Sequence, residues 1–146
     1  KILVQGESSP LIHKHNQAQQ NKNDRFITKS TCYHAALMAT EIEAKAICTL
    51  TNSGYTAYQI SAWRPDSSIL VFTSNRRILT QLNLLWGVKC HYYNRFVSTD
   101  ETVVDVNLIA KEKGYVKTGD SLVNLLAMPV ANKGMVNTLR VSVIKD

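Results

Sequence analysis

Cysteine is scarce in this sequence. The three cysteines, Cys32, Cys48 and Cys90, lie far apart and form no CxxC pair, which argues against a disulfide framework and against a zinc site. Cys48 and Cys90 fall within apolar, strand-like runs, where small buried thiols are common. This use of cysteine predicts a reducing compartment and therefore a cytoplasmic protein.

Long apolar runs and clustered charges are missing as well. No stretch approaches the ~20 apolar residues that a membrane-spanning helix needs, and the start of the chain, which lacks methionine, is too short in apolar residues for a signal peptide. The 17 basic and 11 acidic residues give a net charge of +6, but the basic residues are scattered rather than gathered into a patch. We therefore predict neither a membrane nor a nucleic-acid partner, and we expect a piece cut from a longer chain.

The composition is that of a soluble globular protein, with 45% hydrophobic and 19% charged residues, and 146 residues suffice for one compact core. Residues 1–29 stand apart, because their amide-rich stretch Asn16–Asp24 offers little that could be buried. We interpret residues 1–29 as a partly helical connector that trails from a preceding domain. Residues 30–146 are interpreted as the globular domain.

From residue 30 onward, apolar residues recur alternately with helix and strand spacing. The spacing predicts helices over residues 30–42, 54–64, 75–86 and 98–113, and strands over residues 44–50, 69–73, 88–93, 121–128 and 137–144. Ser30 or Thr31 is expected to cap the first helix and Asn75 the third, whose apolar stripe runs to Trp86. Ser98 and the carboxylate three residues later fit a capping box.

The order of these elements predicts an α/β fold. Alternating strands and helices imply parallel strands with right-handed crossovers, and continuous apolar strands imply helices on both faces. No helix separates the last two strands, so they can pair antiparallel. We predict a three-layer α/β/α sandwich whose mixed sheet has about five strands. The last strand alternates apolar Leu139, Val141 and Val143 with polar residues, which is typical of an edge strand facing solvent or a partner.

Catalytic signatures are absent from the sequence. It contains no G-x-S-x-G elbow, no Walker loop and no G-x-G-x-x-G. The sequence has four histidines, His13, His15, His34 and His91. Their spacing is not that of metal ligands. Asp100, Glu101 and Asp105 fall in or near a first helical turn, where the helix dipole explains them. We predict no catalytic residue and no metal ligand.

The strongest candidate site lies in the stretch CTLTNSGYTAYQIS, residues 48–61, where a strand stops and a helix begins after one short loop. Ligands of open α/β sheets bind beyond the carboxyl ends of the strands, and the N–H groups of a helix start favour an anion. The donors would be hydroxyls, an amide and a closely approaching glycine, from Thr51, Ser53, Thr56, Asn52 and Gly54. A tight N-capped turn needs the same residue types, so a phosphate cradle and a plain turn remain two interpretations.

Two further loops are predicted near the same sheet edge. Residues 73–76 follow the second strand, and residues 129–136, with Lys133 and Gly134, precede the last. Several polar loops at one end of a sheet make a small-molecule pocket. The alternative is that each loop only caps its own element.

Several segments, in order, resemble the C-terminal domain of pyruvate kinase. They are AKAI (44–47), LTNSGYTA (50–57), WRP (63–65), VFTSN (71–75), WGV (86–88), KTGD (117–120) and the stretch 129–141 with its glycine and Asn137. The match runs from about Ser30 to the end of the chain. The resemblance implies that residues 1–29 are the tail of a barrel domain and a linker, and that residues 30–146 are the regulatory domain.

In that family the barrel carries the active site, with its magnesium and potassium, and transfers phosphate from phosphoenolpyruvate to ADP in glycolysis. The resemblance therefore implies a phosphotransferase fragment that is inactive by itself and holds no cofactor. In many members this domain binds a phosphorylated effector. Carried over, the resemblance assigns phosphate binding to Thr51, Asn52, Ser53, Gly54 and Thr56, and a closing loop to Lys133 and Gly134. It also implies a homo-oligomer with a two-fold contact through the final strand.

One position departs from the family pattern. Many members have arginine where this chain has Tyr55, and tyrosine adds no charge. A monophosphate effector, or none, is then expected. The rival interpretation is a stand-alone anion-binding or protein-interaction module that shares the fold without a kinase role. A barrel domain encoded upstream would decide between them.

Overall fold

Five strands form one mixed sheet in a computed structural model, which describes residues 24–95, 97–128 and 136–146. The strands are β1 (Ala46–Leu50), β2 (Ser68–Thr73), β3 (Val88–Tyr92), β4 (Ser121–Leu126) and β5 (Thr138–Val143). They lie in the order β3-β2-β1-β4-β5. The first four are parallel, and β5 pairs antiparallel with β4. The predicted mixed sheet with an antiparallel last strand is confirmed.

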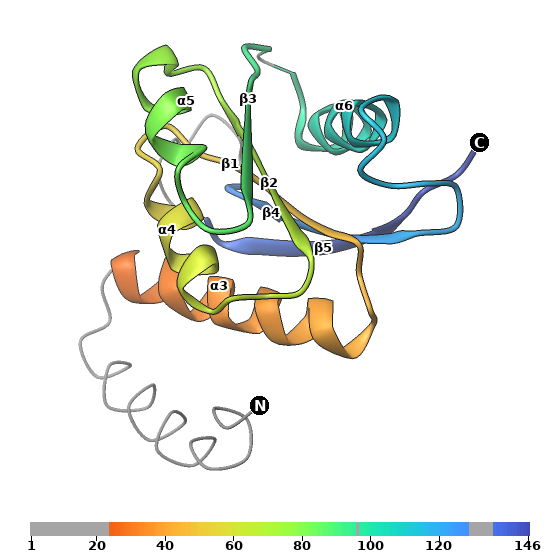
Figure 1. The fold of residues 1–146 in the computed structure, drawn as a ribbon, viewed down its shortest axis with the longest axis horizontal. Coiled ribbons are helices and arrows are strands. Elements are labelled where there is room, and N and C mark those ends of the chain that lie inside the picture. Colours follow the sequence, from red (N-terminus) through yellow and green to blue (C-terminus); the bar gives the residue numbers. More distant parts are fainter. Residues whose placement is uncertain (1–23, 96, 129–135) are drawn as a thin grey trace.

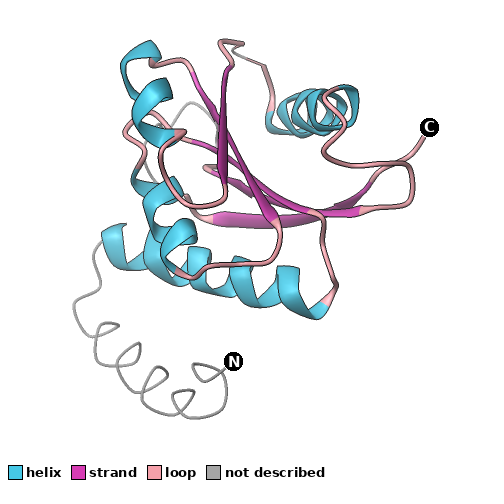
Figure 2. Cartoon of the chain, viewed as in Figure 1, coloured by secondary structure: helices cyan, strands magenta, loops and turns pink. Residues whose placement is uncertain are grey.

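Helices cover both faces of the sheet (Figure 1, Figure 2). One face carries α3 (Asp24–Glu41), α4 (Tyr55–Ala62) and α5 (Arg76–Leu82), and the other carries α6 (Thr99–Glu112). Because side chains alternate along a strand, β1 sends Ile47 into the core below α3 and Cys48 into the core below α6. The structure thus confirms the three-layer α/β/α arrangement.

The three cysteines are free and buried, one each in α3, β1 and β3. Burial raises the pKa of Cys32 and of Cys48 to about 12. Burial also raises the pKa of Cys90 to about 11, against a hydrogen bond from the His91 backbone that lowers it. As predicted for Cys48 and Cys90, these thiols pack as small core side chains.

Helix α3 begins at Asp24, whereas the sequence predicted a start at residue 30. Thr28 is only 2% exposed and extends the buried stripe of Cys32, Ala35 and Ala39 by one turn, so tertiary packing extends the helix. Thr31 does not cap it, since its hydroxyl donates to the Ile27 carbonyl at 2.8 Å. The rest of the predicted connector, up to residue 23, lies outside the described residues.

Helix α5 ends at Leu82, earlier than the predicted Trp86. The Asn83 side chain is the physical reason. Its Nδ2 donates to the Leu79 carbonyl at 3.0 Å and its Oδ1 accepts from the Cys90 N–H at 2.8 Å, so it ties the helix end to β3. Trp86 therefore lies in the following turn and is 46% exposed. None of the helices in the described part of the chain has the length and apolarity to cross a membrane.

Candidate functional site

The loop between β1 and α4, residues 51–54, closes tightly around a glycine. The Gly54 N–H donates to Thr51 Oγ1 at 2.9 Å, and the Tyr55 N–H donates to Ser53 Oγ at 3.3 Å. Gly54 has a φ of 86°, which glycine adopts without steric cost. A Cβ there would lie 2.9 Å from Leu82 Cδ2, so the loop also packs directly on α5.

The loop at the end of β2 lies against this first loop. Asn75 Nδ2 donates to the Asn52 carbonyl at 3.1 Å, and Ser74 Oγ donates to Asn52 Oδ1 at 3.4 Å. Asn75 also caps α5, as predicted, by accepting from the Arg77 N–H at 3.0 Å. The two loops thus form one polar surface at the carboxyl ends of β1 and β2. The third predicted loop, with Lys133 and Gly134, lies outside the described residues.

The predicted site residues differ in their access to solvent. Ser53 is exposed, and Thr51 and Asn52 are half-buried. Thr56 is only 4% exposed, and its carbonyl accepts from the Cys32 thiol at 4.0 Å. The first turn of α4 presents N–H groups without intrahelical acceptors and the positive end of the helix dipole. This arrangement can hold a small anion, and it also performs the capping that a plain turn requires.

Arg25 is a contact of this region that the sequence did not reveal. Its guanidinium carbon lies 3.8 Å from the centre of the Tyr55 ring, which places a cation from α3 beside the first residue of α4. The sequence placed Arg25 in the polar connector. The sequence held one indication of such a contact. Residues 51–56 carry no charge, so an anion site there needs a cation from another element.

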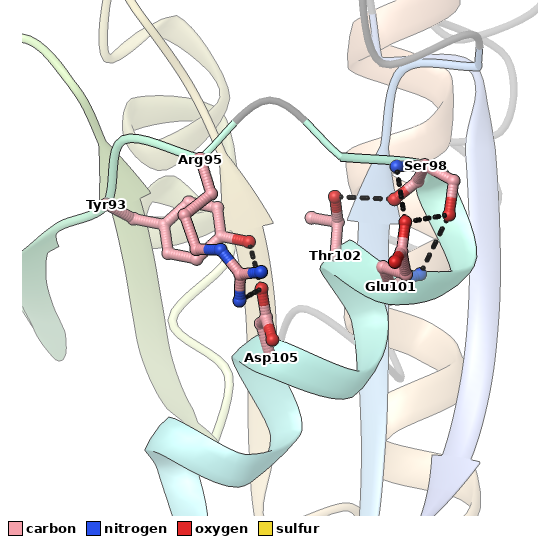
Figure 3. A network of polar contacts seen from close by, with 6 residues as sticks. All are labelled: Tyr93, Arg95, Ser98, Glu101, Thr102 and Asp105. Atoms are coloured by element: carbon pink, nitrogen blue, oxygen red, sulfur yellow. Dashed lines mark hydrogen bonds and ion pairs between the residues drawn. The ribbon is translucent and has the colours of Figure 1, made fainter.

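Three acidic residues of α6, Asp100, Glu101 and Asp105, have structural partners, and Figure 3 shows those of Glu101 and Asp105. Ser98 and Glu101 form the predicted capping box. Asp105 accepts from the Tyr93 hydroxyl at 2.7 Å and pairs with Arg95 at 2.6 Å, while Asp100 pairs with Arg140 at 2.6 Å. Burial and the hydrogen bond to Asp105 raise the pKa of Tyr93 to about 12. A shallow pocket beside them is lined by Arg95, Asp100, Glu101, Val104 and Asp105.

His91 lies on the α6 side of the sheet, between the Phe72 and Tyr115 rings, at centroid distances of 5.8 and 5.6 Å. Its Nε2 is buried and has no hydrogen-bond partner among the described residues. Burial, reinforced by the charge of Lys113, lowers the pKa of His91. Within residues 24–95, 97–128 and 136–146, no group of three or more His, Cys, Asp or Glu side chains is arranged to hold a metal ion.

Comparison with known proteins identifies the family that shares this architecture. The family model described as "Pyruvate kinase, alpha/beta domain" matches residues 29–142. The chain belongs to the pyruvate kinase family. The pyruvate kinase of Clostridium acetobutylicum is 33% identical over 135 residues, which cover 92% of this chain and 28% of that protein. The pyruvate kinase of Lactobacillus delbrueckii subsp. bulgaricus is 35% identical over 106 residues, 73% of this chain and 18% of that protein.

A crystal structure of a pyruvate kinase from Cryptosporidium parvum matches the fold with a TM-score of 0.71 at 23% identity, over 80% of this chain and 22% of that one. The resemblance drawn from the sequence motifs is therefore confirmed. The chain spans 28% of the Clostridium acetobutylicum protein and 18% of the Lactobacillus delbrueckii protein, and the family model that it matches describes an alpha/beta domain.

Proposed function

We propose that this chain is the regulatory part of a pyruvate kinase that transfers phosphate from phosphoenolpyruvate to ADP, and that its loop 51–56 binds a phosphorylated small molecule. The observation that carries the proposal is the loop at the carboxyl end of β1, which leads directly into the first turn of α4. The contact with the 73–76 loop supports it, because hydrogen bonds between the two loops reduce the ordering that binding would require.

Titration with inorganic phosphate, followed by amide NMR, tests the anion site. We expect saturable shifts in residues 51–57 and weak binding. Ser53→Asp should reduce the affinity several-fold or more, because it puts a carboxylate where the phosphate would lie. Gln81→Glu adds the same charge at an exposed position of α5 and serves as the control. Shifts that cluster elsewhere, or an unchanged affinity in Ser53→Asp, would exclude this site.

We also propose that the chain alone makes no pyruvate. The catalytic magnesium and potassium of pyruvate kinases would be held by a barrel domain, which is distinct from the alpha/beta domain matched over residues 29–142. An assay with phosphoenolpyruvate, ADP, magnesium and potassium should show no turnover by the purified chain. Activity that persists through further purification would contradict the assignment of this chain to a regulatory role.

A homo-oligomeric contact through β5 forms the third part of the proposal. In the described sheet β5 pairs with β4 and lies at the edge, with Val141 43% and Val143 54% exposed. The register opposite Val123 places Val141 on the α3 side of the sheet. An exposed edge with apolar side chains favours pairing with a second copy about a two-fold axis.

A further inference from the structure

The loop proposed to bind phosphate has a charge deficit. Residues 51–56 are all uncharged. A phosphate monoester carries a charge of roughly −1.5 to −2 near neutral pH, whereas the N-terminus of a helix offers about +0.5. The loop alone therefore matches a weak or singly charged anion better than a dianion.

Arg25 is placed to supply the missing charge. Its guanidinium carbon lies 3.8 Å from the ring centre of Tyr55, which belongs to residues 51–56 and is the first residue of α4. The ion pairs among the described residues do not involve Arg25. In such a stack the flat face of the guanidinium rests on the ring, and the N–H donors in its plane remain available for a bidentate contact with phosphate.

We infer that Arg25 is the specificity-determining cation of loop 51–56 and selects a dianionic phosphate group as its ligand, with Tyr55 acting as the platform that orients the guanidinium. This inference rests on the function proposed above. It names the ligand class, a phosphate monoester, and a residue from a different helix. Because Arg25 lies in the first turn of α3, occupancy of the loop would also fasten the start of α3 to the start of α4.

The test uses the 146-residue chain, inorganic phosphate as the probe, and amide NMR shifts of residues 51–57 as the readout. Arg25→Gln should weaken phosphate binding about tenfold, as expected for a unit charge a few ångströms from a dianion in a solvent-rich setting. Lys29→Gln removes the same charge one turn further along the exposed side of α3 and should change the affinity less than about twofold. Arg25→Lys keeps the charge but loses the fork, so its affinity should fall between these two.

A second stacked arginine provides a stricter comparison. Arg76 is the last residue of the neighbouring 73–76 loop and the first residue of α5. Its guanidinium carbon lies 3.9 Å from the centre of the Tyr92 ring, at the end of β3. Arg76→Gln should weaken binding less than Arg25→Gln does. Unchanged shifts outside the loop, in each variant, establish that the fold is retained.

The outcomes separate the inference from the proposed function. If phosphate still shifts residues 51–57 but Arg25→Gln binds as well as the parent, or loses no more than Lys29→Gln or Arg76→Gln, the role of Arg25 is wrong and the anion site stands. If the parent chain gives no saturable shifts in the loop, the proposed site fails and the inference fails with it. A selective loss in Arg25→Gln supports both.

Discussion

Gly54 meets two requirements with one residue. Its φ of 86° favours glycine, and its missing Cβ leaves room for Leu82, which is 1% exposed. Gly54→Ala should therefore lower the free energy of unfolding by about 1–2 kcal/mol for the left-handed backbone and by about 1 kcal/mol more for displacing a buried side chain.

Gly114→Ala is the matched control for this prediction. Gly114 has a φ of 80°, and an added Cβ would meet no described atom within 4 Å. It should show the backbone cost alone. Urea unfolding of both variants measures the difference, and equal losses would mean that Leu82 moves aside freely.

His91 predicts a pH dependence of stability. Its pKa is lowered in the folded chain, first by burial and then by the charge of Lys113, so the unfolded chain takes up the proton more readily. The folded state should therefore be most stable above the unfolded-state pKa of about 6.5, and should lose stability as the pH falls through the lower, folded-state pKa. His91→Phe keeps a ring between Phe72 and Tyr115 and should flatten this decline.

The measurement is the urea midpoint between pH 7.5 and pH 5 for the parent, His91→Phe and Lys113→Gln. Lys113→Gln should reduce the decline less than His91→Phe does, because desolvation of His91 remains. A parent chain whose midpoint rises on acidification would show that the neutral imidazole is not the favoured form in the fold.

At the scale of elements, α6 depends on its capping box. Ser98 accepts from the Glu101 N–H at 3.3 Å, and Glu101 accepts from the Ser98 N–H at 3.1 Å. Ser98→Ala should cost about 1 kcal/mol of unfolding free energy. Thr99→Ala, one residue later, leaves the box in place and should cost less. Comparable costs in urea unfolding would mean that packing on the sheet, rather than the cap, fixes where α6 begins.

The helices and strands show which parts of the fold could be predicted from the sequence. The strand boundaries were predicted to within two residues, because buried apolar runs are interrupted by polar turns. The start of α3 was not predicted, because the burial of Thr28 depends on tertiary packing. Asn124 is another limit. In a strand that reads as apolar it is 1% exposed, and its Nδ2 donates to Ser142 at 3.0 Å on β5.

The same limit applies to the candidate site. Loop 51–54 and its approach to the 73–76 loop followed from strand order, since the carboxyl ends of parallel strands meet at one edge. The stack of Arg25 on Tyr55 did not, because it depends on how α3 crosses α4. Lys133 and Gly134 remain predictions.

At the scale of the whole molecule, the edge strand β5 predicts self-association. The parent chain should form a two-fold dimer at high micromolar concentration. Val141→Lys should shift it to a monomer, because a two-fold contact repeats the added charge on both sides. Val104→Lys, at a valine that is 64% exposed on α6, is the control. A parent that light scattering finds monomeric, or equal weakening by both variants, would contradict the β5 contact.

The three buried thiols can also serve as built-in probes of local unfolding. A thiol with a pKa near 11 or 12 is almost entirely protonated at neutral pH and shielded from reagents, so alkylation requires an excursion from the native state. Cys32 reports detachment of α3, and Cys90 reports fraying of the edge strand β3. Cys48, on the central strand, reports the opening of the sheet itself. Mass spectrometry of a timed labelling reaction would rank these events by frequency without an added probe, and α3 and β3 should open before β1.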